Sequence, residues 1–263
     1  MMLQGNNPVR QAARYIFLSV AGSFARPSNG VHILNGHMVH PLQPETGIVE
    51  RMMSALARQV HFVRIEEAVS LIAARTEVDE PVVAFTFDDG FSECLTMVAP
   101  VLEKYGVNAA FFINPNFVEG DEAYVRHFTE KVVKSPGKRP LRWTELLELQ
   151  RRGHVIGAHT LDHALTAIGD EDALRHQIVD CKTVIEAHTG VPCDFFAWPF
   201  GRLEHTGESA VRMACAAYRH VFSQSDYRHY YSFEGRVINR RHFEFFWPVS
   251  HVRYFLSCRK SYE

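Results

Sequence analysis

Apolar runs alternate with stretches of helical spacing along most of the chain. Residues 82–87 and 107–113 are apolar and rich in β-branched and aromatic side chains, which is typical of strands buried on both faces of a parallel sheet. Between them, Leu95, Val98 and Leu102 recur at helical spacing. These two strands and the helix between them form a predicted β-α-β unit.

The same alternation continues on both sides of this unit. We predict further strands at residues 31–34, 62–63, 154–158, 195–198, 218–222 and 236–238, and further helices at 47–59, from about 65, and at 143–152, 170–188 and 209–217. Strands that are separated by helices predict an α/β fold built on a parallel sheet or barrel. A length of 263 residues suits one large domain of this class.

The first residues form a distinct segment, so we divide the chain into an N-terminal extension, 1–30, and a single domain, 31–263. In the extension, two arginines precede a short apolar run at residues 15–21. This pattern also occurs in secretory signal peptides, which would place the protein in the periplasm or outside the cell. Because the run is short and contains Ser19, we favour a helix that packs on the domain. No run approaches the roughly 20 apolar residues of a membrane-spanning helix.

The bulk composition narrows the class of protein. Hydrophobic residues make up 46% and charged residues 22% of the chain, which is typical of a globular protein. A formal net charge of -2 gives no excess of positive charge for binding nucleic acid. The five cysteines are odd in number and include no CxxC pair, which argues against a disulfide framework and favours a cytoplasmic location. Nothing in the sequence predicts an oligomeric state.

Three polar clusters directly follow predicted strands: Asp88-Asp89, residues 159–163 and residues 198–201. The carboxyl ends of parallel strands meet at one edge, which is where α/β folds place their active sites. We therefore expect the three clusters to lie together. The alternative for each is a plain polar loop or surface turn.

The first two clusters contain the donor atoms of a metal site. His159 and His163 are four residues apart, a spacing that puts both imidazoles on one side of a helical turn. A carboxylate from Asp89 would complete a set of two histidines and one aspartate, which leaves positions open for water and substrate. Adjacent aspartates in extended backbone point to opposite sides, but Gly90 permits a turn. One carboxylate would then bind metal while the other acts as a base.

At these residues the chain resembles the polysaccharide deacetylase family, the NodB-homology domain of carbohydrate esterase family four. The family motif T-F-D-D-G is present at residues 86–90, and H-[S/T]-x-x-H at residues 159–163. The third motif, often F-A-Y-P-Y-G, corresponds to Phe-Ala-Trp-Pro-Phe-Gly at residues 196–201. The resemblance covers about residues 31–240. It implies a distorted (β/α) barrel with seven or eight strands, and a catalytic domain over residues 31–263.

The resemblance also implies residue roles. Asp88 corresponds to the general base, and Asp89, His159 and His163 correspond to the ligands of one divalent metal ion, expected to be Zn²⁺. The backbone N–H of Phe200 corresponds to a donor to the oxyanion. The implied substrate is an acetylated amino sugar in a polysaccharide, lipopolysaccharide or glycan precursor, from which an N-acetyl or O-acetyl group is removed. Residues placed to contact this substrate are His37, Trp198 and Pro199.

The general acid is not assigned, because the late L-x-x-H motif of the family is not recognisable. His37, His242 and His251 are the candidates. This gap keeps two other functions open: a non-catalytic glycan-binding protein on the same fold, and a hydrolase of small amides or cyclic imides.

Three further segments have a structural and a functional interpretation. The aromatic-rich residues 243–248 are expected to close the core or an interface, with a sugar-stacking platform as the alternative. Arg240-Arg241 is expected to be a solvated pair, with a partner in a site carboxylate or an anionic substrate as the alternative. Residues 135–138 are expected to form a surface loop that could rim the site.

Overall fold

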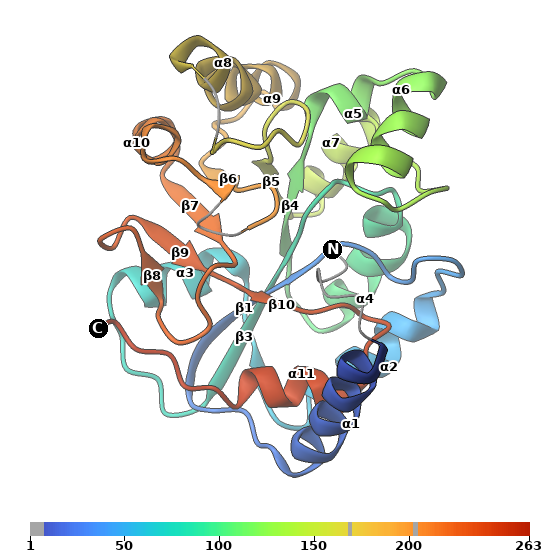
Figure 1. Cartoon of the computed structure of the whole chain (residues 1–263), viewed down its shortest axis with the longest axis vertical. Coiled ribbons are helices and arrows are strands. Elements are labelled where there is room, and N and C mark those ends of the chain that lie inside the picture. The colour runs from blue at the N-terminus through green and yellow to red at the C-terminus, as the bar shows by residue number, and fades with distance from the viewer. Residues whose placement is uncertain (1–7, 168–169, 202–204) are drawn as a thin grey trace.

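The computed structural model describes residues 8–167, 170–201 and 205–263. The chain forms a mixed α/β fold in which one curled sheet is covered by helices (Figure 1). The strands are β1 (Gly30–Gly36), β2 (His61–Phe62), β3 (Pro81–Phe87), β4 (Ala109–Ile113), β5 (Val155–Ala158), β6 (Phe195–Ala197), β7 (His220–Ser223), β8 (Tyr231–Ser232), β9 (Val237–Asn239) and β10 (Arg241–His242).

The helices follow the strands in alternation over most of the chain. They are α1 (Pro8–Phe24), α2 (Thr46–Leu56), α3 (Ile65–Ala73), α4 (Ala99–Lys104), α5 (Pro115–Glu119), α6 (Glu122–His127), α7 (Trp143–Arg151), α8 (Glu171–Arg175), α9 (Cys181–Thr189), α10 (Glu208–Ala217) and α11 (Val249–Leu256). Three π-helical turns, η1 (Cys94–Val98), η2 (Phe128–Val132) and η3 (His176–Asp180), extend the helices beside them. The predicted strands and helices are all present, with ends that differ by a few residues.

The sheet has the order β10-β1-β3-β4-β5-β6-β7-β9-β8, with β2 paired to β3. All pairings are parallel except that of β8 with β9. Strands β9 and β10 are separated only by Arg240, yet β9 pairs with β7 and β10 pairs with β1, at opposite ends of this order. One broken strand therefore closes the curled sheet into a distorted barrel, as predicted.

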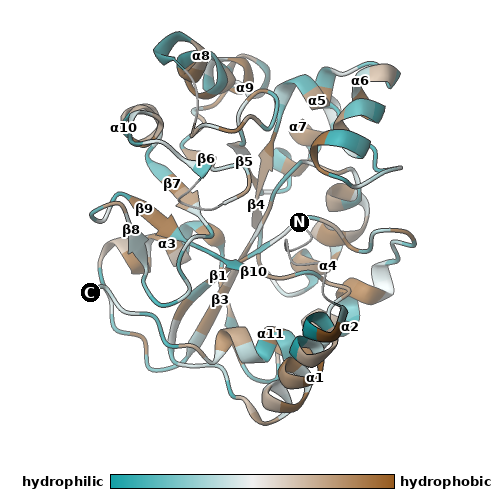
Figure 2. Ribbon diagram, in the orientation of Figure 1, coloured by the Kyte–Doolittle hydropathy of each residue, from teal (hydrophilic) through white to brown (hydrophobic). Residues whose placement is uncertain are grey.

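Successive side chains of each strand point to opposite sides of the sheet. Phe85 and Phe87 of β3 belong to the larger hydrophobic cluster, which also contains the buried side chains of α2, α4, α7, α9 and α10. Val82 and Ala84 belong to a second cluster, together with Phe112 of β4 and Phe222 of β7. Asp88 continues the alternation of this second set. Figure 2 shows brown strands such as β4 and β9 in the centre and helices around them that alternate between teal and brown.

Helix α1 lies along α11 at one end of the molecule (Figure 1). Leu18 and Gly22 are its buried residues, and a Cβ atom at Gly22 would lie 1.9 Å from the carbonyl oxygen of Ser250.

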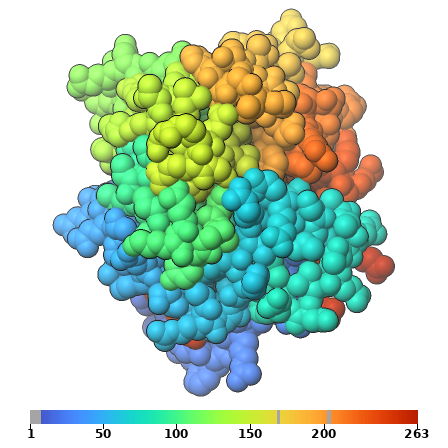
Figure 3. Space-filling model, turned by 180° about the vertical axis from the view of Figure 1, so that it is seen from behind, coloured from blue at the N-terminus to red at the C-terminus, as the bar shows by residue number. Residues whose placement is uncertain are grey.

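No helix of the described part of the chain is long and apolar enough to span a membrane. Seen from behind, the molecule has one continuous surface to which segments far apart in the sequence contribute (Figure 3).

Several structural elements were not predicted from the sequence. These elements are the helices α5, α6 and α11 and the short strands β8 and β10. Lys138 is 8% exposed and not part of a free surface loop, because its ammonium group donates to Glu93 over 2.6 Å. The prediction of a solvated Arg240-Arg241 pair was wrong, since both side chains are 0% exposed. Phe243 and Phe245 are buried in the core, as expected.

Candidate metal centre

The barrel brings the three predicted clusters to one rim. Strand β3 ends directly before Asp88, β5 directly before His159, and β6 directly before Trp198. Because all three strands run in the same direction, their carboxyl ends lie at the same side of the sheet. The side chains of Asp88, Asp89 and His159 are buried there.

Asp89, His159 and His163 offer one potential ligand atom each, and these atoms all lie within 4.8 Å of one another. The Oδ1 atom of Asp89 is 3.8 Å from Nε2 of His159 and 3.5 Å from Nε2 of His163. Ligands about 2.0–2.2 Å from a tetrahedral zinc ion are about 3.4 Å apart, so these separations fit such an ion. The predicted ligand set is therefore close together in space.

Two polar atoms of this group lack the partners that buried polar atoms normally have. Oδ1 of Asp89 and Nδ1 of His163 are buried and have no hydrogen-bond partner among the described residues. Burial raises the pKa of Asp89 and lowers the pKa of both histidines, so the imidazoles are neutral. A buried carboxylate oxygen without a donor beside two neutral imidazoles fits a divalent cation.

The orientation of His159 follows from a neighbouring strand. Its Nδ1 atom lies 2.8 Å from the carbonyl oxygen of Ala197, at the end of β6. A nitrogen next to a carbonyl oxygen must carry the proton, which leaves Nε2 with a lone pair toward Asp89. The same contact connects the second cluster to the third.

The two histidines are on a loop and not on a helical turn, so that part of the prediction was wrong. Thr160 and His163 have φ angles of 61° and 57°, in the left-handed region. The Thr160 hydroxyl accepts the Ala164 amide over 2.9 Å, and the Asn114 side-chain amide donates to the carbonyl oxygens of His159 and Thr160. These contacts give the loop the curvature that brings the imidazoles together.

The turn after β3 separates the two neighbouring aspartates. Asp89 and Gly90 have φ angles of 69° and 68°, so the chain leaves the extended conformation immediately after Asp88. A Cβ atom at position 90 would also lie 2.9 Å from Cγ2 of Ile113. This turn lets both carboxylates face the same space, as predicted from Gly90.

Arg240 forms a paired hydrogen bond with Asp88, a site carboxylate of the kind that the sequence offered only as the alternative to a solvated pair. Its Nη1 and Nη2 atoms donate to Oδ1 and Oδ2 of Asp88 over 2.8 and 2.9 Å, and the amide of Asn35 donates to Oδ2 over 3.0 Å. Burial acts to raise the pKa of Asp88, but the charge of Arg240 and its hydrogen bonds outweigh this effect and hold the pKa well below its usual range. Asp88 is therefore ionised at neutral pH.

His37 lies at the end of β1, next to the carboxylate of Glu244. Its Nδ1 atom is 2.8 Å from Glu244 Oε1, and its backbone N–H donates to Oε2. Burial acts to lower the pKa of His37, but Glu244, with smaller effects of Asp89 and Asp88, raises it to about 9. His37 is thus a cation whose pKa both aspartates help to raise.

The other two acid candidates have different positions. His242 lies beside His37, with ring centroids 5.2 Å apart, and burial lowers its pKa to about 4. His251 lies outside the site, since its Nε2 atom is 3.0 Å from the Ser19 hydroxyl in the contact between α1 and α11. Glu244 was not singled out in the sequence, although its position two residues after His242 is a signal that could have identified it.

The third cluster borders the metal ligands. The Phe200 ring is 4.6 Å from that of His163, and its φ angle is 62°. Trp198 is 1% exposed and packs against Phe196, so its ring is not presented to solvent as a sugar platform. Pro199 joins these two aromatic residues at the rim.

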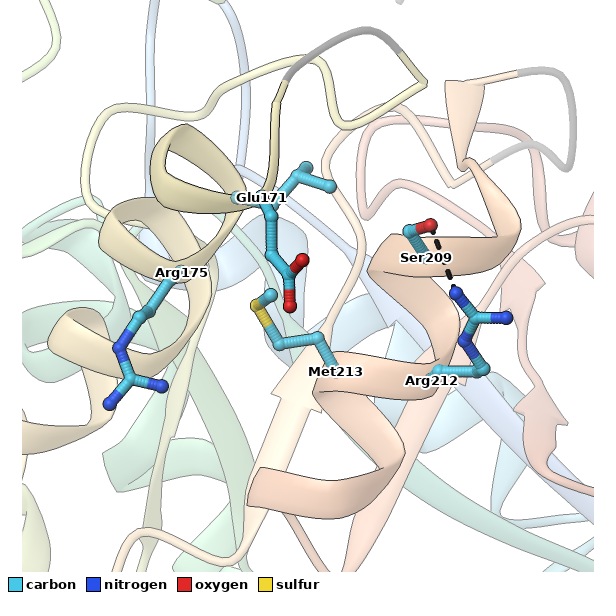
Figure 4. A pocket seen from close by; sticks show the side chains of 6 residues that line it. Glu171, Arg175, Ser209, Arg212 and Met213 are labelled. Atoms are coloured by element: carbon cyan, nitrogen blue, oxygen red, sulfur yellow. Dashed lines mark hydrogen bonds between the residues drawn. The ribbon is translucent and has the colours of Figure 1, made fainter.

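A separate surface pocket of about 380 Å³ lies between α8 and α10. Figure 4 shows Glu171 pointing between the two helices, Arg175 pointing away, and a hydrogen bond from Arg212 to Ser209. None of the predicted site residues lines this pocket. Its lining consists of Glu171, Leu174, Arg175, Ser209, Arg212 and Met213.

Comparison with known sequences identifies related proteins. The sequence model of the family described as Polysaccharide deacetylase matches residues 75–216. A peptidoglycan-N-acetylglucosamine deacetylase of Bacillus cereus is 29% identical over 122 residues, which are 46% of this chain and 37% of that protein. The YxkH protein of Bacillus subtilis is 24% identical over 137 residues, 52% of this chain and 43% of that protein. The chain thus spans less than half the length of either relative.

Solved structures share the fold. IcaB from Ammonifex degensii aligns with a TM-score of 0.69 and 20% identity, over 89% of this chain and 99% of that one. The Streptococcus pyogenes deacetylase PplD aligns with a TM-score of 0.67 and 16% identity, over 88% and 99% of the two chains. The family match includes the two motifs that carry Asp88, Asp89, His159 and His163. The chain therefore belongs to the polysaccharide deacetylase family.

Proposed function

We propose that this protein is a metal-dependent hydrolase that removes an N-acetyl or O-acetyl group from an amino sugar in a polysaccharide, lipopolysaccharide or glycan precursor. The observation that carries the proposal is the buried group of Asp89, His159 and His163 beside the ionised Asp88. Within the proposed enzyme, residues 31–263 form one catalytic domain, and residues 1–30 are an extension whose helix α1 packs on α11.

We assign Asp89, His159 and His163 as ligands of one divalent ion, and zinc is the ion we expect, because imidazole and carboxylate ligands in a tetrahedral set suit it. When bound, such an ion supplies a Lewis acid that polarises the acetyl carbonyl and lowers the pKa of water. Three protein ligands leave a position open, as a catalytic site requires.

Asp88 is assigned as the general base. It accepts a proton from the water whose oxygen bonds to the acetyl carbon. The paired hydrogen bond with Arg240 holds the carboxylate in one orientation and keeps it ionised. A carboxylate of low pKa is a weak base, so the proton moves to Asp88 as the water attacks and not before.

His37 is assigned as the general acid for the N-acetyl reaction. Its raised pKa keeps it protonated at neutral pH, and Glu244 engages Nδ1, which leaves Nε2–H as the donor. When the bond between the acetyl carbon and the nitrogen breaks, His37 donates a proton to the leaving amine. Acetate and a free amino sugar are the products.

We assign the backbone N–H of Phe200 as the hydrogen-bond donor that stabilises the negative charge developing on the carbonyl oxygen. A fixed N–H group costs no reorganisation during the reaction. Pro199 and His37 are assigned to the rim that contacts substrate. Trp198 supports this rim from below, because its ring is buried.

The proposal is tested by the release of acetate from N-acetylglucosamine oligomers by zinc-loaded protein. We expect Asp88→Asn to bind zinc as the wild type does and to lose about 10²–10⁴ in turnover, the usual contribution of a general base. The matched control is Asp79→Asn, at an exposed aspartate, which should keep full activity. Full activity of Asp88→Asn would show that the base is another residue.

The same assay separates the two other functions. A glycan-binding protein would bind the oligomers and release no acetate at any zinc loading. A hydrolase of small amides or cyclic imides would turn over those compounds and leave the oligomers intact.

A further inference from the structure

A second group of potential metal ligands lies at the same rim. His37, His242 and Glu244 offer one ligand atom each, and these atoms all lie within 4.8 Å of one another. In the described part of the chain, this group and the one around Asp89 are the two that meet this criterion. Both consist of two imidazoles and one carboxylate, a set that binds zinc in many catalytic sites.

The separations in the second group are close to those that a zinc ion requires. Oε1 of Glu244 is 2.8 Å from Nδ1 of His37 and 3.7 Å from Nε2 of His242. The two values lie on either side of the roughly 3.4 Å between the ligands of a tetrahedral zinc ion. The shorter contact is a hydrogen bond that must lengthen slightly when a metal ion replaces the proton.

The ligands of the second group are held in place by the backbone. Asn35 and His242 are direct neighbours in the pairing of β1 with β10, so His37 and Glu244, each two residues later, emerge side by side. Glu244 Oε2 accepts the backbone N–H groups of His37 and Met38 over 3.2 and 3.3 Å, which leaves Oε1 directed toward the histidines. A pre-positioned carboxylate favours metal binding.

In the described part of the chain, no hydrogen bond explains the orientation of His242. Its Nδ1 atom is buried and has no hydrogen-bond partner among the described residues, and its ring packs on Trp247 at a centroid distance of 4.9 Å. Its Nε2 atom faces Glu244 but is too far away for a hydrogen bond. A metal ion between Nε2 of His242 and Oε1 of Glu244 would bridge these two side chains.

We propose that His37, His242 and Glu244 form a second divalent-metal site, and that occupation of this site inhibits the enzyme. A metal ion bound to Nδ1 of His37 takes the place of the Nδ1 proton, so the ring is no longer the imidazolium whose Nε2–H is donated to the leaving amine. The binding itself does not depend on the proposed function, whereas the inhibition rests on His37 as the general acid. An ion at the second site must break the hydrogen bond between His37 and Glu244, whereas Oδ1 of Asp89 has no hydrogen-bond partner among the described residues, so we expect the second ion to bind more weakly than the first.

The proposal is tested by titration of chelator-treated protein with Zn²⁺, with bound zinc counted after equilibrium dialysis and binding followed by calorimetry. We expect two zinc ions in the wild type, one in His242→Ala, which lacks the weak site, and one in His163→Ala, which lacks the tight site. The control variant His176→Ala removes an exposed histidine that pairs with Asp180, and it should still bind two. Near-ultraviolet circular dichroism checks the fold, and His242→Gln replaces His242→Ala if the latter is misfolded.

Acetate release then measures the regulatory effect. We expect the wild type to lose at least tenfold in activity between one equivalent and a large excess of zinc. His242→Ala, compared with its own activity at one equivalent, should keep more than half under the same conditions. One bound zinc in the wild type, or two in a folded His242 variant, would overturn the second site.

The two proposals fail in different ways. If zinc counts follow the expected pattern but no acetate is released from any N-acetylated oligomer, the second site stands and the proposed function falls. If acetate is released but excess zinc inhibits wild type and His242→Ala equally, the deacetylase stands and the inhibitory role of the second site is excluded.

Discussion

Neighbouring residues in this site owe their chemistry to partners that are distant in the sequence. Asp88 and Asp89 are adjacent, yet the charge of Arg240 lowers the pKa of Asp88 while burial raises that of Asp89. Arg240 is itself fully buried between the rings of Phe112 and Phe222, 5.0 and 5.9 Å from its guanidinium group. The sequence predicts a division of the two carboxylates into base and ligand, and the contact of Arg240 with Asp88 supports that proposed division.

The charge of Glu244 is expected to set the alkaline limit of activity. In Glu244→Gln, the carboxylate that opposes the effect of burial on His37 is lost, so the pKa of His37 falls from its raised value of about 9. We expect the alkaline limb of kcat/KM against pH to move to lower pH, with zinc content unchanged at one equivalent. Glu67→Gln, an exposed control on α3, should leave the profile in place, and an unmoved limb in Glu244→Gln would exclude His37 as the acid.

The contact between His37 and Glu244 also affects how the free energy of unfolding depends on pH. A histidine whose pKa is raised in the folded state stabilises it fully below its unfolded pKa of about 6.5, and this stabilisation is lost as the pH rises through the folded value. For His37 the window is therefore from about 6.5 to about 9. The free energy of unfolding of metal-free protein should decline over this window less steeply in Glu244→Gln than in the wild type.

At the scale of elements, the site depends on how strands end. Asp89, Thr160, His163 and Phe200 all have positive φ angles, and each follows a barrel strand. Non-glycine residues in this region are uncommon and cost free energy, so surrounding contacts must hold them. The sequence predicted that the clusters follow strands, but it predicted a helical turn for the histidines, because hydrogen bonds from another strand were not visible in it.

Asn114, at the end of β4, provides such contacts for the histidine loop. Asn114→Ala removes the amide that donates to the carbonyl oxygens of His159 and Thr160. We expect zinc affinity, measured by competition with a chelator, to fall about 10–100-fold, as for other residues that orient ligands. The free energy of unfolding should fall by about 1–3 kcal/mol, the cost of leaving buried carbonyls without donors.

A control variant tests whether the loss of zinc affinity in Asn114→Ala comes from the hydrogen bonds to the ligand backbone. Asn116→Ala removes an amide that donates to Asp162 in the same region but does not contact the backbone of the ligands. Its zinc affinity should change less than that of Asn114→Ala. Equal losses would show that the hydrogen bonds to the ligand backbone have no special role.

At the scale of the whole molecule, the ligands come from loops that follow β3 and β5, so metal binding and folding are coupled. Zinc that binds the folded chain stabilises it by an amount that grows with the logarithm of zinc concentration over Kd, about 2.7 kcal/mol at 100 times Kd. We expect a chelator to lower Tm and one equivalent of zinc to restore it. His163→Ala should show a much smaller response, and an equal response would place the tight metal elsewhere.

The contact between α1 and α11 is a second property of the whole molecule. Alanine normally stabilises a helix interior by about 1 kcal/mol relative to glycine, but at Gly22 its Cβ would meet the backbone of Ser250. We therefore expect Gly22→Ala to lower the free energy of unfolding by about 1–3 kcal/mol, as overpacking does. Ser23→Ala at the exposed next position is the control, and a higher Tm for Gly22→Ala would show that α1 does not need this close packing.

The sequence by itself determined the order of strands and helices, the family and the cluster that each strand end carries. These features are local, because they depend on the period of apolar residues and on short motifs such as residues 86–90. Only the tertiary structure decided which residues surround those motifs. Arg240 and Glu244 come from the segment that closes the barrel, more than 150 residues after Asp88 in the sequence, and the local sequence does not show that they contact Asp88 and His37.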